Sequence, residues 1–318
     1  MNWVNAALAV GFAYAAALAY YPTRAARRPV REAAFGVALI LVCVSPLWVT
    51  DAPFLRLLAA MAATAFGVKL YDLVMDPVSA SGLAGGRYAA WLWNFAALVW
   101  GEAGKIARRN WRSDVSRLVV GGILFAAGGG LLGLVMRTDW TFTSFAIEHV
   151  VKVTTLFATL IPGGVAYSAA WRLAGQPALE MMVHPYLSRT PAEFWRRYNL
   201  PAQQFLYERI FKPSGGRRHP IRATLLTFTW SALIHELLFA VILLRVEGYQ
   251  TAFFLIQGLA VAATLGIRPR GGSAIAAILA TMAFMYTSGV LFFASFDSVL
   301  DVYDNPLPWA ARSPLGRG

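Results

Sequence analysis

Apolar stretches long enough to cross a membrane recur along the whole chain, and short polar segments separate them. A bilayer core about 30 Å thick needs about 20 apolar residues in a helix. The pattern therefore predicts an all-α, polytopic transmembrane helical bundle that forms one domain over residues 1–318. Its eight candidate spans lie at about residues 2–21, 33–50, 53–75, 116–136, 146–170, 223–244, 250–267 and 273–295.

The lysines and arginines predict how this bundle is oriented. Segments 22–32, 76–115, 171–222 and 268–272 hold 4, 5, 9 and 2 of them, and the alternate connections hold almost none. Because cytoplasmic loops of membrane proteins gather basic residues, these four segments are predicted to be cytosolic and both termini to lie outside. A composition rich in Ala, Arg and Gly favours a bacterial source, and hence the cytoplasmic (inner) membrane.

Composition supports the membrane class and excludes others. Hydrophobic residues make up 58% of the chain and charged residues only 14%, against about 25% charged residues in soluble domains. The net charge of +12 is spread over loops, so it does not indicate nucleic acid binding. Cys43 is the only cysteine, which excludes an internal disulfide or a zinc finger. We expect no metal and no bound cofactor.

Two features predict how the helices are arranged. Residues 87–109 mix Trp91, Trp93 and Trp100 with basic residues, which is typical of an interfacial helix or a short re-entrant segment. Glycines cluster inside the span 116–136, at 121–122, 128–130 and 133. Small residues let helices approach closely, so this span is expected to pack tightly against a neighbour.

Candidate chemistry concentrates in residues 180–245. Thr190, Pro191 and Glu193 have the spacing of a capping box, so a helix should begin at Pro191. Pro201 disfavours helical geometry at the residue before it, and should interrupt the helix next to Asn199. The Asn199 amide would then lie beside unpaired backbone groups.

The sixth span carries a polar stripe inside an apolar helix. Thr224, Thr227, Ser231 and His235 are three or four residues apart and therefore share one face. A rise of about 1.5 Å per residue puts His235 roughly 18 Å from Ala223, near the middle of the core. Ionisable residues at that depth are costly and usually functional. The stripe predicts a polar-walled tunnel from the cytosol to His235, or else hydroxyl groups that bond to their own helix backbone.

Three segments together resemble membrane-bound O-acyltransferases, the MBOAT superfamily, in its wax-synthase-like branch. They are Phe194-Trp-Arg-Arg-Tyr-Asn199, the Pro-Ser-Gly-Gly-Arg217 turn and Ser231-Ala-Leu-Ile-His235-Glu-Leu237. The resemblance implies an MBOAT-like helical fold with His235 as the catalytic histidine and Asn199 as its partner. It also implies a chamber where an acyl thioester, expected to be acyl-CoA, meets an alcohol. Tyr198 departs from the tryptophan often found in this element.

The neighbouring side chains receive provisional roles from this interpretation. His235 would accept the alcohol proton, and Asn199 would stabilise the oxyanion or hold the acyl carbonyl. Four side chains are expected to contact substrate: Trp195, Tyr198, Ser231 and Thr227. Six basic side chains are expected to receive the coenzyme A phosphates: Arg196, Arg197, Arg209, Lys212, Arg217 and Arg218. Alternatively, these basic residues reflect membrane topology alone.

Other charged residues in the spans have local explanations. Glu148 and Lys152 are four residues apart at the external end of the fifth span and are expected to form an ion pair, with His149 beside them. Lys69 and Asp72 are expected to pair in the same way. Glu236 points about 100° away from His235 and is expected to orient or pack rather than act as a second base.

The sequence leaves several alternatives open. An ion-coupled transporter would also keep a histidine inside the membrane and a broken helix, and an inactive scaffold would keep the fold alone. The expected partners are acyl-CoA or an acyl carrier protein, a hydroxyl-bearing lipid or alcohol, and membrane lipids. Acyl length, the identity of the acceptor and the oligomeric state do not follow from the sequence.

Overall fold

The computed structural model describes residues 2–77, 84–103 and 110–310. Apart from connecting segments and one isolated β-bridge, this part of the chain is built from helices. The helices are α1 (Asn2–Ala19), α2 (Arg28–Val44), α3 (Pro53–Met75), α5 (Gly85–Trp93), α6 (Trp100–Ala103), α7 (Trp111–Arg137), α8 (Phe145–Leu173), α9 (Pro191–Arg197), α10 (Leu200–Leu206), α11 (Pro220–Leu243), α12 (Tyr249–Thr264) and α13 (Ser273–Leu300).

Seven helical segments in the described residues are long and apolar enough to cross a membrane. They correspond to seven of the eight predicted spans and confirm the all-α polytopic class. The remaining window, 250–267, forms α12, which has only 16 residues. At 1.5 Å per residue α12 is about 24 Å long, less than the roughly 30 Å of a bilayer core.

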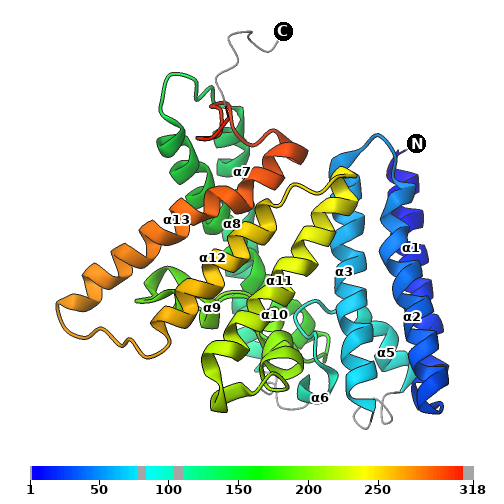
Figure 1. The fold of residues 1–318 in the computed structure, drawn as a ribbon. Coiled ribbons are helices and arrows are strands. Elements are labelled where there is room, and N and C mark those ends of the chain that lie inside the picture. The colour runs from blue at the N-terminus through cyan, green and yellow to red at the C-terminus, as the bar shows by residue number, and fades with distance from the viewer. Residues whose placement is uncertain (1, 78–83, 104–109, 311–318) are drawn as a thin grey trace.

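Helices α1, α2 and α3 stand side by side, whereas α13 runs obliquely to them, and the short helices α5, α6, α9 and α10 lie in the lower half of the view (Figure 1). Helices α1, α2 and α3 form one edge of the bundle, and α11 packs on both α3 and α12. Helices α7 and α8 form a hairpin. The start of α1 and the last described residues lie at the same upper end in Figure 1. This arrangement agrees with termini on one side of a membrane, and the cytosolic assignment of the other side remains a prediction.

In the segment predicted to be interfacial or re-entrant, residues 104–109 lie outside the described residues, and the preceding helix α5 packs one face into the bundle. Tyr88 and Trp91 of α5 are almost fully buried. The Lys69 ammonium group on α3 donates hydrogen bonds to the carbonyls of Trp91 and Asn94, the latter at 2.8 Å. These carbonyls end α5, where the helix dipole favours a cation. The burial agrees with the re-entrant alternative.

The expected Lys69–Asp72 ion pair is wrong. Lys69 is occupied by the α5 carbonyls, and Asp72 Oδ1 instead accepts a hydrogen bond of 2.6 Å from Nε of Arg209. Arg209 also contacts Asp76 at 3.2 Å. Although burial alone would lower the pKa of Arg209, these carboxylates raise it above its ordinary value, so Arg209 is a fixed cation. It fastens the segment after α10 to α3 and is not a free phosphate ligand.

Glycine allows the α7–α8 hairpin to pack closely, as predicted. A Cβ atom at Gly121 would lie 2.8 Å from the carbonyl oxygen of Pro162, and one at Gly128 would lie 2.8 Å from Oγ1 of Thr159. Gly122, Gly129, Gly130 and Gly133 have open space at that position. Only part of the glycine cluster therefore serves this contact.

The predicted Glu148–Lys152 ion pair is confirmed, at 2.6 Å, but it is buried rather than peripheral. Glu148 also accepts hydrogen bonds from the backbone N–H groups of Asp304 and Asn305, at 2.7 and 3.0 Å. His149 lies beside this pair, with Nδ1 2.6 Å from the hydroxyl of Tyr303 and Nε2 3.0 Å from a backbone carbonyl. The start of α8 thus holds the segment that follows α13.

Candidate active site

The first part of the candidate site is α9, which begins at Pro191 as predicted. The Thr190 hydroxyl accepts a hydrogen bond from the backbone N–H of Glu193 at 3.1 Å. The Glu193 carboxylate accepts one from the N–H of Arg189 at 2.8 Å, so two free donors at the helix start are satisfied.

Asn199 lies at a sharp break between α9 and α10, as Pro201 predicted. Its backbone is left-handed, with φ 46° and ψ 62°, a conformation that asparagine adopts more readily than most residues. Its Oδ1 accepts a hydrogen bond of 3.4 Å from the N–H of Ala202 and caps α10. No hydrogen bond from its Nδ2 to another described residue is present, so this donor is available.

A short antiparallel contact holds the backbone on both sides of Asn199. The N–H of Val183 donates to the carbonyl of Arg197 at 2.9 Å, and the N–H of Leu200 donates to the carbonyl of Met181 at 3.0 Å. The break is therefore fixed by the loop before α9. No pattern in the sequence indicates this pairing.

Trp195 connects α9 to α12 and α13. Its Nε1–H donates to Oε1 of Gln257 on α12 at 3.0 Å, and Nε2 of Gln257 donates to Oγ of Ser288 on α13 at 2.8 Å. Gln257 is completely buried. Sequence analysis missed Gln257 and Ser288, although a glutamine inside an apolar helix is itself a signal that a polar partner is needed.

His235 lies within α11, about 22 Å from Pro220 and about 12 Å from Leu243 at 1.5 Å per residue. Its Nδ1 is 2.8 Å from the backbone carbonyl of Ser231. A carbonyl only accepts hydrogen bonds, so we assign the proton to Nδ1 and the lone pair to Nε2. A neutral imidazole in this tautomer can accept a proton at Nε2.

Aromatic rings link His235 to the α9 element. The ring of Phe254 lies 4.2 Å from that of His235 and 5.9 Å from that of Trp195, measured between centroids. Tyr198 in turn packs against Trp195 at 5.6 Å. Burial raises the pKa of the Tyr198 phenol, which therefore stays protonated at neutral pH. His235, Trp195 and Tyr198 thus belong to one connected cluster.

The polar stripe on α11 has a mixed character. The Thr227 hydroxyl donates to the carbonyl of Ala223 at 2.7 Å, which is the backbone-bonding alternative. Thr224 and Ser231 are buried without a described side-chain hydrogen bond. The stripe is therefore structural at Thr227, whereas the hydroxyl of Ser231 remains available.

The arginines near the site divide into bound and free groups. Arg197 forms an ion pair with Glu193 and donates a hydrogen bond to the carbonyl of His184 at 3.3 Å, so its guanidinium group is already occupied. Arg196, Arg217 and Arg218 are exposed, and no ion pair to another described residue involves them. Lys212 pairs with Glu208 at 2.7 Å.

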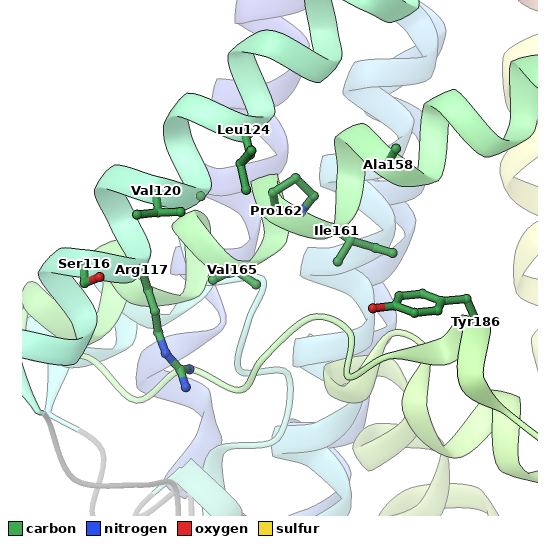
Figure 2. A pocket seen from close by; sticks show the side chains of 10 residues that line it. Ser116, Arg117, Val120, Leu124, Ala158, Ile161, Pro162, Val165 and Tyr186 are labelled. Carbon is green, nitrogen blue, oxygen red and sulfur yellow. The ribbon is translucent and has the colours of Figure 1, made fainter.

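Two surface pockets accompany this arrangement. The first has a volume of about 530 Å³ and lies between α7 and α8 (Figure 2). The second, of about 330 Å³, lies beside the end of α11. His235 and Asn199 line neither of them, so the tunnel joining these two residues remains a prediction. Within the described residues no three His, Cys, Asp or Glu side chains form a group that could hold a metal ion.

The family comparison covers the part of the chain that contains these residues. Residues 140–296 match the model of MBOAT, the membrane-bound O-acyltransferase family. The matched region is just under half of the chain and includes both Asn199 and His235. This match supports membership of the MBOAT superfamily.

The MBOAT match has two general consequences. Together with the seven apolar helices, it indicates an integral membrane protein. The family description implies O-acyltransferase activity in general and does not distinguish a wax-synthase-like branch. No curated protein matches the chain.

The Trp195–Gln257–Ser288 chain gives a stability prediction. Replacing the buried Gln257 with leucine leaves the indole N–H of the half-buried Trp195 without its acceptor, at a cost of about 1–3 kcal/mol. We expect thermal unfolding in detergent to show a lower Tm for Gln257→Leu, whereas Gln203→Leu, on α10, should have little effect. Trp195→Phe combined with Gln257→Leu should lower the Tm by less than the sum of the single changes. Full additivity would contradict the coupling.

Proposed function

We propose that this protein is a membrane-embedded O-acyltransferase that moves a fatty acyl group from acyl-CoA to the hydroxyl of a lipid or long-chain alcohol, as a wax-ester synthase does. The MBOAT match supports the reaction class. The single observation that carries the proposal further is the His235 tautomer, because its Nδ1 is bound to the Ser231 carbonyl and its Nε2 keeps a lone pair.

In the proposed mechanism, His235 Nε2 accepts the proton of the alcohol while the alcohol oxygen attacks the thioester carbonyl carbon. The carbonyl oxygen becomes an oxyanion, and the free Nδ2–H of Asn199 donates a hydrogen bond to it. Collapse of this intermediate breaks the carbon–sulfur bond. The departing thiolate takes the proton from His235, which returns to its neutral form with the ester and free coenzyme A as products.

The side chains around these groups would bind the two substrates. Trp195 and Tyr198 belong to the aromatic cluster that reaches His235, and Ser231 has a free hydroxyl one turn away. The exposed Arg196, Arg217 and Arg218 would receive the coenzyme A phosphates, and this role needs free guanidinium groups. Arg197 is held by Glu193 and would position α9 instead.

The proposed location is the cytoplasmic membrane of a bacterium, with the 171–222 segment cytosolic, where acyl-CoA is made available. The basic residues of that segment support this orientation. Both termini would then lie outside.

A transfer assay tests the proposal directly. Purified protein in nanodiscs is mixed with radiolabelled palmitoyl-CoA and, in parallel, with hexadecanol, diacylglycerol or a sterol. We expect an ester to form with at least one acceptor, in step with release of free coenzyme A. Absence of thioester turnover with every acceptor would contradict an acyltransferase and favour a carrier or an inactive scaffold.

Asn199→Asp removes the amide donor and keeps the helix cap. Aspartate keeps the Oδ1 that caps α10 and tolerates the left-handed backbone, but it lacks the Nδ2–H group. We expect kcat to fall by about 10² to 10³, the usual effect of losing one oxyanion donor. The Tm should hardly change.

Asn110→Asp is a matched control, because Oδ1 of Asn110 caps α7 by accepting from the N–H of Ser113 at 3.4 Å. This variant should keep full activity. If Asn199→Asp is as active as Asn110→Asp, Asn199 does not stabilise the oxyanion.

A further inference from the structure

A groove of about 530 Å³ lies between α7 and α8 (Figure 2), and neither His235 nor Asn199 lines it. The two helices touch closely at Gly121, and the groove opens beside this contact. It is lined by Ser116, Arg117, Val120, Gly121 and Leu124 of α7, by Ala158, Ile161, Pro162 and Val165 of α8, and by Tyr186.

The walls of the groove change character from one end to the other. Val120 and Leu124 form an apolar wall on α7, and Ile161 and Val165 face them from α8 (Figure 2). Ser116 and Arg117 form a polar end, only five or six residues after the exposed Trp111 that begins α7. Tryptophan commonly marks the membrane interface, so this end lies near headgroup level.

The polar end carries an excess of positive charge. The Glu180 carboxylate forms ion pairs with both Arg117 and Arg172, the second at 3.0 Å. Asp114 also forms an ion pair with Arg172, at 2.7 Å. Arg112 adds a third guanidinium one turn before Ser116 on the same face. Arg117 and Arg172 thus pair with the two carboxylates, and Arg112 supplies the excess positive charge at this end. Arg117 keeps 48% of its side chain exposed, so an anion can reach it.

We infer that this groove binds a membrane phospholipid with an anionic headgroup. One acyl chain lies along Val120, Leu124, Ile161 and Val165, and the phosphate contacts Arg117 and Ser116. Basic pockets between transmembrane helices on the cytoplasmic side bind such headgroups. The volume suits a small-molecule site rather than a protein helix, which is about 10 Å wide. The inference is independent of the proposed catalytic activity.

Native mass spectrometry of the full-length protein tests this assignment, with dioleoylphosphatidylglycerol and dioleoylphosphatidylcholine added in equal amounts. We expect about fivefold to tenfold greater retention of the anionic lipid, because an arginine near the membrane surface attracts an anionic headgroup. Arg117→Gln should reduce this preference to near unity. Equal retention of the two lipids by the unmodified protein would overturn the assignment.

Replacing either of two alanines with tryptophan tests where the lipid binds. Ala158→Trp fills the groove from α8 and should abolish retention, whereas Ala127→Trp adds the same side chain at an exposed position of α7 outside the groove. Unchanged retention in Ala158→Trp would overturn the assignment. Displacement of the lipid by stoichiometric palmitoyl-CoA would do so as well, because the groove would then belong to an acyl donor.

Discussion

Replacing His235 with alanine should reduce acyl transfer by about 10² to 10⁴, the contribution of a general base. The substitution removes Nε2, the nitrogen that keeps a lone pair because Nδ1 is bound to the Ser231 carbonyl. The fold should survive, because His235 makes a local hydrogen bond within α11 and one close ring contact with Phe254. The measurement is kcat for ester formation from palmitoyl-CoA and the best acceptor, together with the Tm in detergent.

His219→Ala provides the matched control for this loss. His219 is exposed, precedes α11 and has no role in the proposed reaction. This variant should keep both activity and Tm. An His235→Ala protein that still forms ester at the unmodified rate would show that another group accepts the alcohol proton.

Replacing Glu148 with alanine should give a large loss of stability. The change leaves the buried Lys152 ammonium without its 2.6 Å partner and removes the acceptor for the N–H groups of Asp304 and Asn305. Breaking a buried ion pair by removing one partner costs about 3–5 kcal/mol. We expect the Tm to fall by roughly 10 °C and the segment after α13 to become sensitive to proteolysis.

Glu32→Ala is the corresponding control at the protein surface. Glu32 and Arg28 are also four residues apart, at 2.8 Å, but both side chains are exposed. Exposed pairs contribute little because water screens them. The Tm of this variant should therefore stay almost unchanged. Equal Tm losses in the two variants would mean that burial does not strengthen the Glu148–Lys152 pair.

Local features of the chain were predictable because short-range sequence patterns determine them. Thr190 and Glu193 fixed the start of α9, and Pro201 fixed the break at Asn199. The i,i+4 spacing of Glu148 and Lys152 was enough to predict their contact. Seven of the eight hydrophobic windows form helices that can span a membrane.

Contacts between distant segments could not be read from spacing. Lys69 and Asp72 share a helix face, yet the α5 carbonyls and Arg209 are stronger partners supplied by other parts of the fold. The start of α12 also has a tertiary cause. Glu236 on α11 accepts hydrogen bonds from the N–H groups of Gly248 and Thr251, at 2.7 and 2.9 Å, and so caps the beginning of α12. This contact agrees with the orienting role expected for Glu236.

The proposed reaction requires His235 and Asn199 to act on one thioester. This can be examined in a structure of the protein with a long-chain alcohol and a non-hydrolysable ketone analogue of palmitoyl-CoA, in which a methylene group separates the carbonyl from sulfur. We expect the alcohol oxygen within hydrogen-bonding reach of His235 Nε2, about 2.6–3.2 Å, and the acyl carbonyl oxygen equally close to Asn199 Nδ2. An analogue whose acyl carbonyl lies in a chamber bounded by neither side chain would contradict it.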